Sequence, residues 1–167
     1  GLTFEAEVSG GDETVPPDYT PAQTVETLAR RKGEAVLPLR PEKPIIAADS
    51  VVSIDGLILG KPKDDEAAKD TLRRLSGRTH EIFTGVCLLA NGKRDVFHMS
   101  TQVKFYPLME EEIAEYVAMG ESRGRAGAYG IEGIGVVLVE SICGDYSNIV
   151  GLPVAETIRR LHRLLAR

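Results

Sequence analysis

Residues 44–62 of the chain, PIIAADSVVSIDGLILGKP, contain the pattern from which the fold is best predicted. The run Ile45–Ile54 is rich in small and β-branched residues, which favour a buried strand. Asp55-Gly56 is a dipeptide typical of a two-residue turn between antiparallel strands, and the apolar run Leu57–Leu59 follows it directly. The stretch therefore predicts a β-hairpin.

Asp49 and Ser50 interrupt the hydrophobic strand at its middle. A bare carboxylate in apolar surroundings is unfavourable, so we expect a lysine or a metal ion close to Asp49. With an ideal two-residue turn, Ser50 would lie opposite Lys61 and Asp49 opposite Pro62. A bulge at Gly60 would instead bring Asp49 and Lys61 to the same face. Asp49 is either a structural carboxylate paired with Lys61 or a residue with a chemical role, and the hairpin alone leaves both open.

The composition predicts one globular domain over residues 1–167 and disfavours several classes of partner. The chain is 43% hydrophobic and 27% charged, which suits a folded domain of this length. Its net charge is −5 and aromatic residues make up 5%, so a nucleic-acid partner is disfavoured. No apolar run approaches the roughly 20 residues that span a bilayer, so we expect no membrane partner. Cys87 and Cys143 stand in apolar segments, which favours reduced core residues and a cytoplasmic location.

Capping residues, turn dipeptides and apolar periodicity predict an α/β fold with a second antiparallel hairpin. Thr20 and Gln23 have the form of a capping box before the first helix, and Asp64 can cap the second helix. Asn91-Gly92 is typical of the turn in the second hairpin. The predicted helices cover residues 21–36, 65–76, 113–120 and 154–165, and the predicted strands cover residues 45–54, 57–59, 81–90, 93–106 and 134–139.

Charged residues in three other segments are candidates for binding or catalysis, although each segment also has a structural explanation. Glycines precede Asp12-Glu13, which suits either a divalent cation or a solvated turn. Arg30-Arg31-Lys32 gives the first helix a basic segment that can reach a phosphate or simply face solvent. The glycine-rich stretch 123–135 contains Arg125 and Glu132, and it can bring the backbone close to an anion or form a string of turns.

Seven short segments follow one another along nearly the whole chain in the order found in a known family. They are Asp12-Glu13, Leu28-Ala29-Arg30-Arg31-Lys32, Ala48-Asp49-Ser50, Gly60-Lys61-Pro62, Leu75-Ser76-Gly77-Arg78-Thr79-His80, Ala126-Gly127-Ala128-Tyr129-Gly130-Ile131-Glu132-Gly133 and Asp145-Tyr146-Ser147-Asn148-Ile149-Val150-Gly151-Leu152-Pro153. With these segments the chain resembles the Maf family of nucleoside triphosphate pyrophosphatases, also described as septum-formation proteins.

The resemblance implies a fold and an activity. The implied fold is an α/β, Maf/ITPase-like mixed sheet with flanking helices and a cleft between two lobes. The implied reaction is hydrolysis of a nucleoside triphosphate to the monophosphate and pyrophosphate. The resemblance also implies Mg²⁺ or another divalent cation, such as Mn²⁺ or Co²⁺, and a homodimer.

The resemblance further assigns roles to single residues. It implies that Glu13 and Asp49 hold the metal ion and that Asp49 also activates the attacking water. It implies that Lys32 and Lys61 are phosphate or catalytic contacts. The expected substrate-binding residues are Ser50, Arg78, Arg125 and Glu132.

Two departures from the family pattern bear on activity and substrate. The family opens with a strand that leads into a Ser-x-Ser-Pro-Arg-Arg motif with phosphate-binding arginines. This chain has no such motif, so we expect it to lack that strand and helix. Glu132 stands where the branch acting on dTTP and UTP has Gln, whereas the branch acting on 7-methyl-GTP has Glu.

Residues 128–131 look like the dTTP and UTP branch, so we expect attack of water on the α-phosphorus of dTTP, UTP or a modified pyrimidine nucleotide. Two alternatives stay open. One is a 7-methyl-GTP pyrophosphatase of the same family. The other is a regulator of cell division that senses the nucleotide without hydrolysing it.

Overall fold

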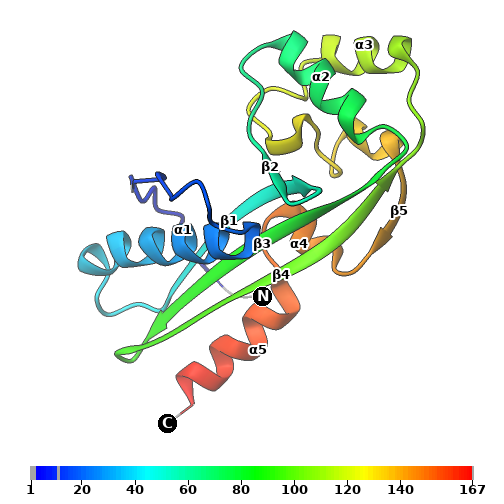
Figure 1. Cartoon of the computed structure of the whole chain (residues 1–167). Helices are drawn as coiled ribbons and strands as arrows, with labels where there is room; N and C mark the ends of the chain where they lie inside the picture. The colour runs from blue at the N-terminus through cyan, green and yellow to red at the C-terminus, as the bar shows by residue number, and fades with distance from the viewer. Residues whose placement is uncertain (1–2, 11, 167) are drawn as a thin grey trace.

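The computed structural model describes residues 3–10 and 12–166, and a five-stranded sheet lies at its centre (Figure 1). The strands, in the order β2-β1-β3-β4-β5 across the sheet, are β1 (Ile45–Ile54), β2 (Leu57–Leu59), β3 (Thr79–Ala90), β4 (Lys93–Phe105) and β5 (Val139–Cys143). The expected α/β architecture with flanking helices is confirmed. Within the described residues each strand pair is antiparallel, where a mixed sheet was expected.

Two hairpins organise the sheet, and both turns match the sequence. Ile54 pairs with Leu57 across Asp55-Gly56, and both turn residues have positive φ angles, 53° and 77°. Asn91-Gly92 joins β3 to β4 with φ angles of 52° and 71°. Such angles are typical of the tight turns that suit the twist of antiparallel strands. The turn dipeptides therefore predict both hairpins correctly.

The ladder between β1 and β2 is shorter than the sequence predicts. It contains three residue pairs, all close to the turn. The predicted pairs of Ser50 with Lys61 and of Asp49 with Pro62 do not form, and that prediction is wrong. Pro62 has no N–H to donate to a ladder, and the chain leaves the sheet before it. Among the described residues, the outer edge of β1 beside Asp49 and Ser50 therefore carries no strand.

The predicted helices are confirmed, with small changes at their ends. α1 (Pro21–Val36) begins with the predicted capping box at Thr20 and packs on β1 and β3. Asp64 caps α2 (Asp65–Leu75) by accepting a hydrogen bond from the Ala67 N–H (2.8 Å). No helix within the described residues is both long and apolar enough to cross a bilayer. The remaining helices are α3 (Glu110–Ala118), α4 (Tyr146–Val150) and α5 (Val154–Leu165), with short 3₁₀ helices η1 (Leu37–Leu39), η2 (Ala126–Ala128) and η3 (Ile134–Leu138).

The strand predicted over residues 134–139 is wrong. Residues 134–138 form the 3₁₀ helix η3, and β5 begins only at Val139. Most large side chains of this run are exposed, so its apolar character does not reflect a buried strand. The Gly135 N–H donates a hydrogen bond to the Glu121 carboxylate (3.1 Å). This hydrogen bond joins two residues that are distant in sequence, and it helps to hold residues 134–138 in a helical turn.

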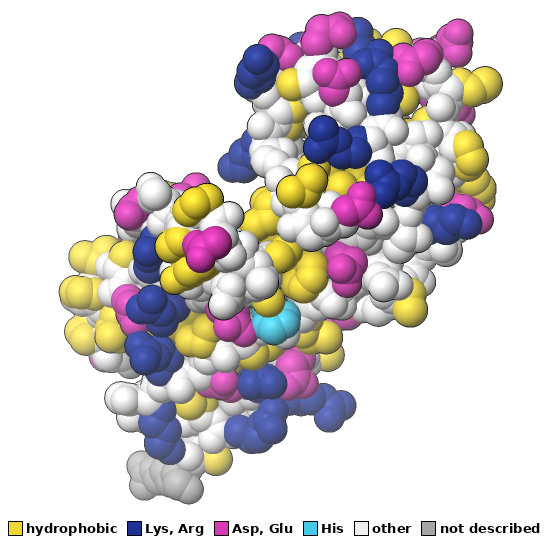
Figure 2. Space-filling model, viewed as in Figure 1, with side chains coloured by type: hydrophobic (Ala, Val, Ile, Leu, Met, Phe, Trp, Pro, Cys, Tyr) yellow, Lys and Arg dark blue, Asp and Glu magenta, His cyan; other side chains and the backbone are white. Residues whose placement is uncertain are grey.

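The elements form two lobes (Figure 1). α2, α3 and the segment 120–138 gather at one end of the sheet, around a large hydrophobic cluster that includes Leu72, Phe105 and Ile113. α1 and α5 cover opposite faces of the other end, because their clusters use alternate residues of β3. The surface is hollowed between the lobes, which confirms the expected cleft (Figure 2).

Candidate active site

One face of β1 carries a cluster of charged side chains from three parts of the chain. Asp49 lies in β1, Lys32 in α1 and Glu13 in the segment before α1. The Lys32 ammonium group donates a hydrogen bond to Asp49 Oδ1 (2.5 Å) and lies 3.4 Å from Glu13 Oε1. The Asp49 side chain is 13% exposed, whereas the Glu13 side chain is 68% exposed. One ammonium group therefore joins a largely buried carboxylate to a carboxylate at the surface.

The position of Lys32 depends on how closely α1 approaches the sheet. Gly85 in β3 is the direct partner of Asp49, so both positions are on the face that α1 covers. A Cβ at Gly85 would lie 2.3 Å from the carbonyl group of Val25 in α1. Lys32 follows Val25 by about two helical turns and is on the same side of the helix. The glycine therefore lets α1 lie close enough to the sheet for Lys32 to reach Asp49.

The surroundings of the cluster shift two pKa values. Burial raises the pKa of Asp49 above its ordinary range, although the hydrogen bond and charge of Lys32 act in the opposite direction. For Lys32, burial alone would lower the pKa, but the hydrogen bond and charge of Asp49, with the charge of Glu13, raise it overall. Asp49 is thus a stronger base than a fully solvated aspartate, while Lys32 stays positively charged.

A cavity of about 230 Å³ lies between the lobes, with one wall formed by β1. Its polar lining includes Ser50 from β1, Lys61 from the segment after β2, and Arg125 and Glu132 from the segment around η2. Ser50 follows Asp49 directly, so its side chain points to the opposite face of the strand. Arg125 donates a hydrogen bond to Glu132, and the charges of these two residues offset each other.

Lys61 connects the charged cluster with the cavity. It lines the cavity, and its positive charge acts to lower the pKa of Asp49. The structure thus brings most of the predicted site residues together around the middle of β1. Arg78 lies elsewhere, because its guanidinium group donates to Asp55 at the β1–β2 turn (2.6 Å) and does not line the cavity.

Sequence reasoning missed a set of buried polar residues behind the cavity. Thr84 and Asn148 are fully buried and are connected to Ser50 by hydrogen bonds. His80 is also buried, which lowers its pKa to about 4, and its Nε2 lies 2.7 Å from the hydroxyl oxygen of the cavity residue Tyr129. His80, Tyr129 and Asn148 stand in the segments that carry the family resemblance, which is the signal that could have found them. Thr84 stands outside those segments and follows only from the register of β1 against β3.

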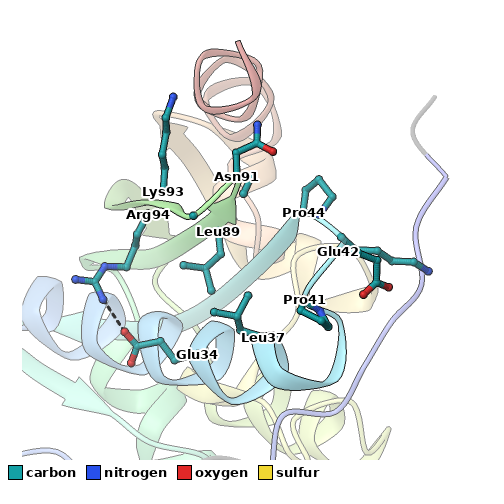
Figure 3. Close-up of a pocket in the computed structure, with 12 residues that line it drawn as sticks. Glu34, Leu37, Pro41, Glu42, Pro44, Leu89, Asn91, Lys93 and Arg94 are labelled. Atoms are coloured by element: carbon teal, nitrogen blue, oxygen red, sulfur yellow. Dashed lines mark hydrogen bonds and ion pairs between the residues drawn. The ribbon is translucent and has the colours of Figure 1, made fainter. Parts of the chain in front are cut away.

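A larger cavity of about 600 Å³ lies at the far end of the sheet, beside the β3–β4 turn (Figure 3). Leu37, Pro41 and Leu89 contribute apolar side chains to its lining. Arg94 forms an ion pair with Glu34 at this cavity (2.7 Å). None of the residues predicted for the site lines it. The smaller cavity, which adjoins the charged cluster, is therefore the candidate active site.

Comparison with known proteins identifies relatives along almost the whole chain. A dTTP/UTP pyrophosphatase of Bacillus cytotoxicus is 45% identical over 160 residues, which cover 96% of this chain and 84% of that protein. A dTTP/UTP pyrophosphatase of a Geobacillus species is 44% identical over 163 residues, covering 98% of this chain and 88% of the relative. A dTTP/UTP pyrophosphatase of Bacillus pumilus is 40% identical over 161 residues, covering 96% and 85%. The family model described as Maf-like protein matches residues 1–164, and the chain therefore belongs to this family.

Proposed function

We propose that the chain hydrolyses dTTP and UTP to the nucleoside monophosphate and pyrophosphate. The observation that carries the proposal is the cluster in which Lys32 joins Asp49 and Glu13 beside the cavity between the lobes. The relatives of 40–45% identity are named dTTP/UTP pyrophosphatases, which supports the same substrate class for this chain.

The proposed chemistry is attack of water on the α-phosphorus of the triphosphate. Asp49 accepts a proton from the water, and its raised pKa makes it a better base for this step. A bond forms between the water oxygen and the α-phosphorus, while the bond from that phosphorus to the bridging oxygen breaks. Pyrophosphate leaves with the electron pair of the broken bond. Lys32 and Lys61 offset the negative charge on the phosphate oxygens.

The carboxylates of the cluster fit a divalent cation that is shared with the substrate. The described residues contain no group of three or more His, Cys, Asp or Glu side chains that could hold a metal ion without other ligands. Glu13 and Asp49 approach the same ammonium group, and Mg²⁺ is commonly held by one or two carboxylates together with substrate phosphates. These two residues are therefore the proposed ligands of Mg²⁺, Mn²⁺ or Co²⁺. When bound, the ion would polarise the phosphate oxygens and neutralise part of their charge.

The Arg125–Glu132 pair bears on the choice between the two family branches. A 7-methylguanine base carries a positive charge, and a free carboxylate in the cavity would favour it. In this chain the charge of Glu132 is already offset by Arg125. The ion pair therefore favours the neutral bases of dTTP and UTP. Ser50, Arg125 and Glu132 are the proposed substrate contacts in the cavity, and Arg78 stays a prediction.

The test is pyrophosphate release by the purified chain, with Mg²⁺ or Mn²⁺, from dTTP, UTP, CTP, ATP, GTP and 7-methyl-GTP. We expect the fastest release from dTTP and UTP. Release from 7-methyl-GTP alone would overturn the dTTP/UTP assignment and make Glu132 the better guide to the substrate. Binding of nucleotides without any release would favour the regulator that senses the nucleotide without hydrolysis.

Three further expectations stay predictions. They are a single domain over residues 1–167, a homodimer and a cytoplasmic location. Limited proteolysis tests the first, analytical ultracentrifugation the second and cell fractionation the third.

A further inference from the structure

A chain of hydrogen bonds behind the cavity ends at Ser50. The hydroxyl oxygens of Ser50 and Thr84 are 2.7 Å apart, and the Thr84 hydroxyl lies 2.9 Å from the main-chain oxygen of Asn148. Ser50 and Thr84 are direct partners in β1 and β3, so their side chains share one face of the sheet. Thr84 and Asn148 are both 0% exposed, so solvent does not compete for these hydrogen bonds.

The backbone fixes the direction of the protons in this chain. A carbonyl oxygen can only accept, so Thr84 donates its single hydroxyl proton to Asn148. Thr84 then has only lone pairs left for Ser50, and the Ser50 hydroxyl donates its own proton to Thr84. The remaining lone pairs of the Ser50 oxygen are available to the cavity that Ser50 lines. Ser50 therefore offers the cavity an acceptor and not a donor.

We propose that this fixed polarity selects the nucleobase, with Ser50 Oγ accepting a hydrogen bond from the imide N3–H of uracil or thymine. Cytosine has an unprotonated N3 in the same place, so two acceptors would face each other. Thr84 and Asn148 act as positioning residues, because they set the direction of the Ser50 proton without contacting the base. The inference rests on the proposed function and deepens it, because it separates UTP from CTP.

The cavity suits a base in this position. Val52, Ile82 and Tyr129 contribute apolar surface that can pack against the faces of a ring. The volume of about 230 Å³ is below the roughly 300–1,000 Å³ of sites that bury a whole drug-sized ligand, so the cavity holds only part of a nucleotide. Lys61 lines the same cavity and acts electrostatically on Asp49. A nucleotide can therefore place its base beside Ser50 and its phosphates toward the charged cluster.

The test measures the binding of nucleoside monophosphates by calorimetry, because binding needs no turnover. Thr84→Val keeps the shape of the side chain and removes its hydroxyl group, so that Ser50 can turn and donate. The Asn148 carbonyl keeps its hydrogen bond from the Gly151 N–H (3.1 Å). We expect the unaltered chain to bind UMP about tenfold more tightly than CMP, and Thr84→Val to lose most of this preference.

Thr157→Val is the matched control. Thr157 is 1% exposed and lies in α5, outside the cavity lining, and its hydroxyl group has no partner within the described part of the chain. This variant should keep the preference for UMP. Ser50→Ala removes the acceptor itself and should lose the preference, which gives a second variant if Thr84→Val does not fold.

Two analogues identify the donor. In 3-methyl-UMP a methyl group replaces the imide proton, so this analogue should bind about tenfold more weakly than UMP. A 3′-deoxy-UMP lacks a sugar hydroxyl and should bind like UMP. If only the deoxy analogue binds weakly, the sugar is the donor and the inference is wrong. An unchanged preference in both Thr84→Val and Ser50→Ala would also overturn it. A preference for UMP that follows these expectations, without pyrophosphate release from any triphosphate, would overturn the proposed function alone.

Discussion

Asp49 and Ser50 are neighbours in β1, yet they lie on opposite faces of the sheet and have different surroundings. On the face toward α1, Asp49 meets the charges of Lys32 and Glu13. On the other face, Ser50 meets the neutral hydroxyl group of Thr84, whose hydrogen bonds have a fixed direction. The alternation of side chains along a strand separates these environments over a single residue step. One strand can therefore serve phosphate chemistry on one face and base recognition on the other.

Removal of the negative charge from the α1 face should have the largest effect. Asp49→Asn keeps the size of the side chain but removes the proposed base. We expect the rate of pyrophosphate release to fall by roughly 10³-fold, a typical share for a general base. The preference for UMP over CMP should stay unchanged, because Ser50 lies on the other face. Steady-state kinetics and calorimetric titration measure the two effects.

Asp70→Asn is the matched control for this substitution. Asp70 lies in α2, its side chain is 76% exposed, and it pairs with Arg73 at the surface. The control should keep the unaltered rate. An Asp49→Asn protein that releases pyrophosphate at that rate would remove Asp49 from the proposed mechanism.

Removal of the positive charge from the same face should lower stability. Lys32→Gln leaves the largely buried Asp49 carboxylate without its partner. We expect the free energy of unfolding to fall by about 3 kcal/mol. Adding Asp49→Asn should recover part of this loss, because asparagine carries no charge. Urea unfolding of the two single variants, the double variant and the unaltered chain measures the coupling. Strictly additive effects would show that the two side chains do not stabilise each other.

The distance between α1 and the sheet offers a third way to disturb the charged face. Gly85→Ala places a Cβ 2.3 Å from the Val25 carbonyl group, so α1 must shift away from β3. We expect a loss of about 2 to 3 kcal/mol in the free energy of unfolding, as for other overpacked sites. Gly60→Ala is the control, because a Cβ there meets no atom within 4 Å. Equal stability of the two variants, measured by urea unfolding, would show that the close approach of α1 is not needed.

Local signals in the sequence predict much of this fold. The turn Asp55-Gly56 and the caps Thr20 and Asp64 are correct predictions because each depends on residues that are close in sequence. The sequence wrongly predicts a strand where η3 forms, because part of what holds η3 is a contact between Gly135 and the distant Glu121. Tertiary contacts of this kind have no signature in a short window of sequence.

The predictions for the site divide in the same way, into local features that the sequence indicates and long-range contacts that it does not. The sequence correctly indicates that Asp49 needs a nearby cation, but the hairpin suggests Lys61, whereas the hydrogen bond comes from Lys32. That contact depends on how closely α1 packs over Gly85, and spacing along the chain contains no such information. The sequence does not indicate Thr84 for a related reason. Thr84 lies beside Ser50 only because of the register in which β1 pairs with β3.

The smallest effect is expected at His80, which lies behind the cavity. Burial lowers the pKa of His80 to about 4, whereas an ordinary histidine titrates near 6.5. The unfolded chain therefore takes up this proton first as the pH falls. The contribution of His80 to stability is fully present above about pH 6.5 and is lost progressively down to about pH 4. Between pH 7 and pH 5 the expected loss is about 2 kcal/mol.

His80→Gln isolates this contribution, because glutamine does not titrate but can still hydrogen bond to Tyr129. Urea unfolding at pH 7 and pH 5 compares the two proteins, and the groups that titrate elsewhere act equally in both. The variant should lose about 2 kcal/mol less than the unaltered chain over this range. Equal losses would mean that His80 takes up its proton in the folded chain as easily as in the unfolded one. The region behind the cavity would then tolerate a buried charge, as the surroundings of Asp49 do on the opposite face of the sheet.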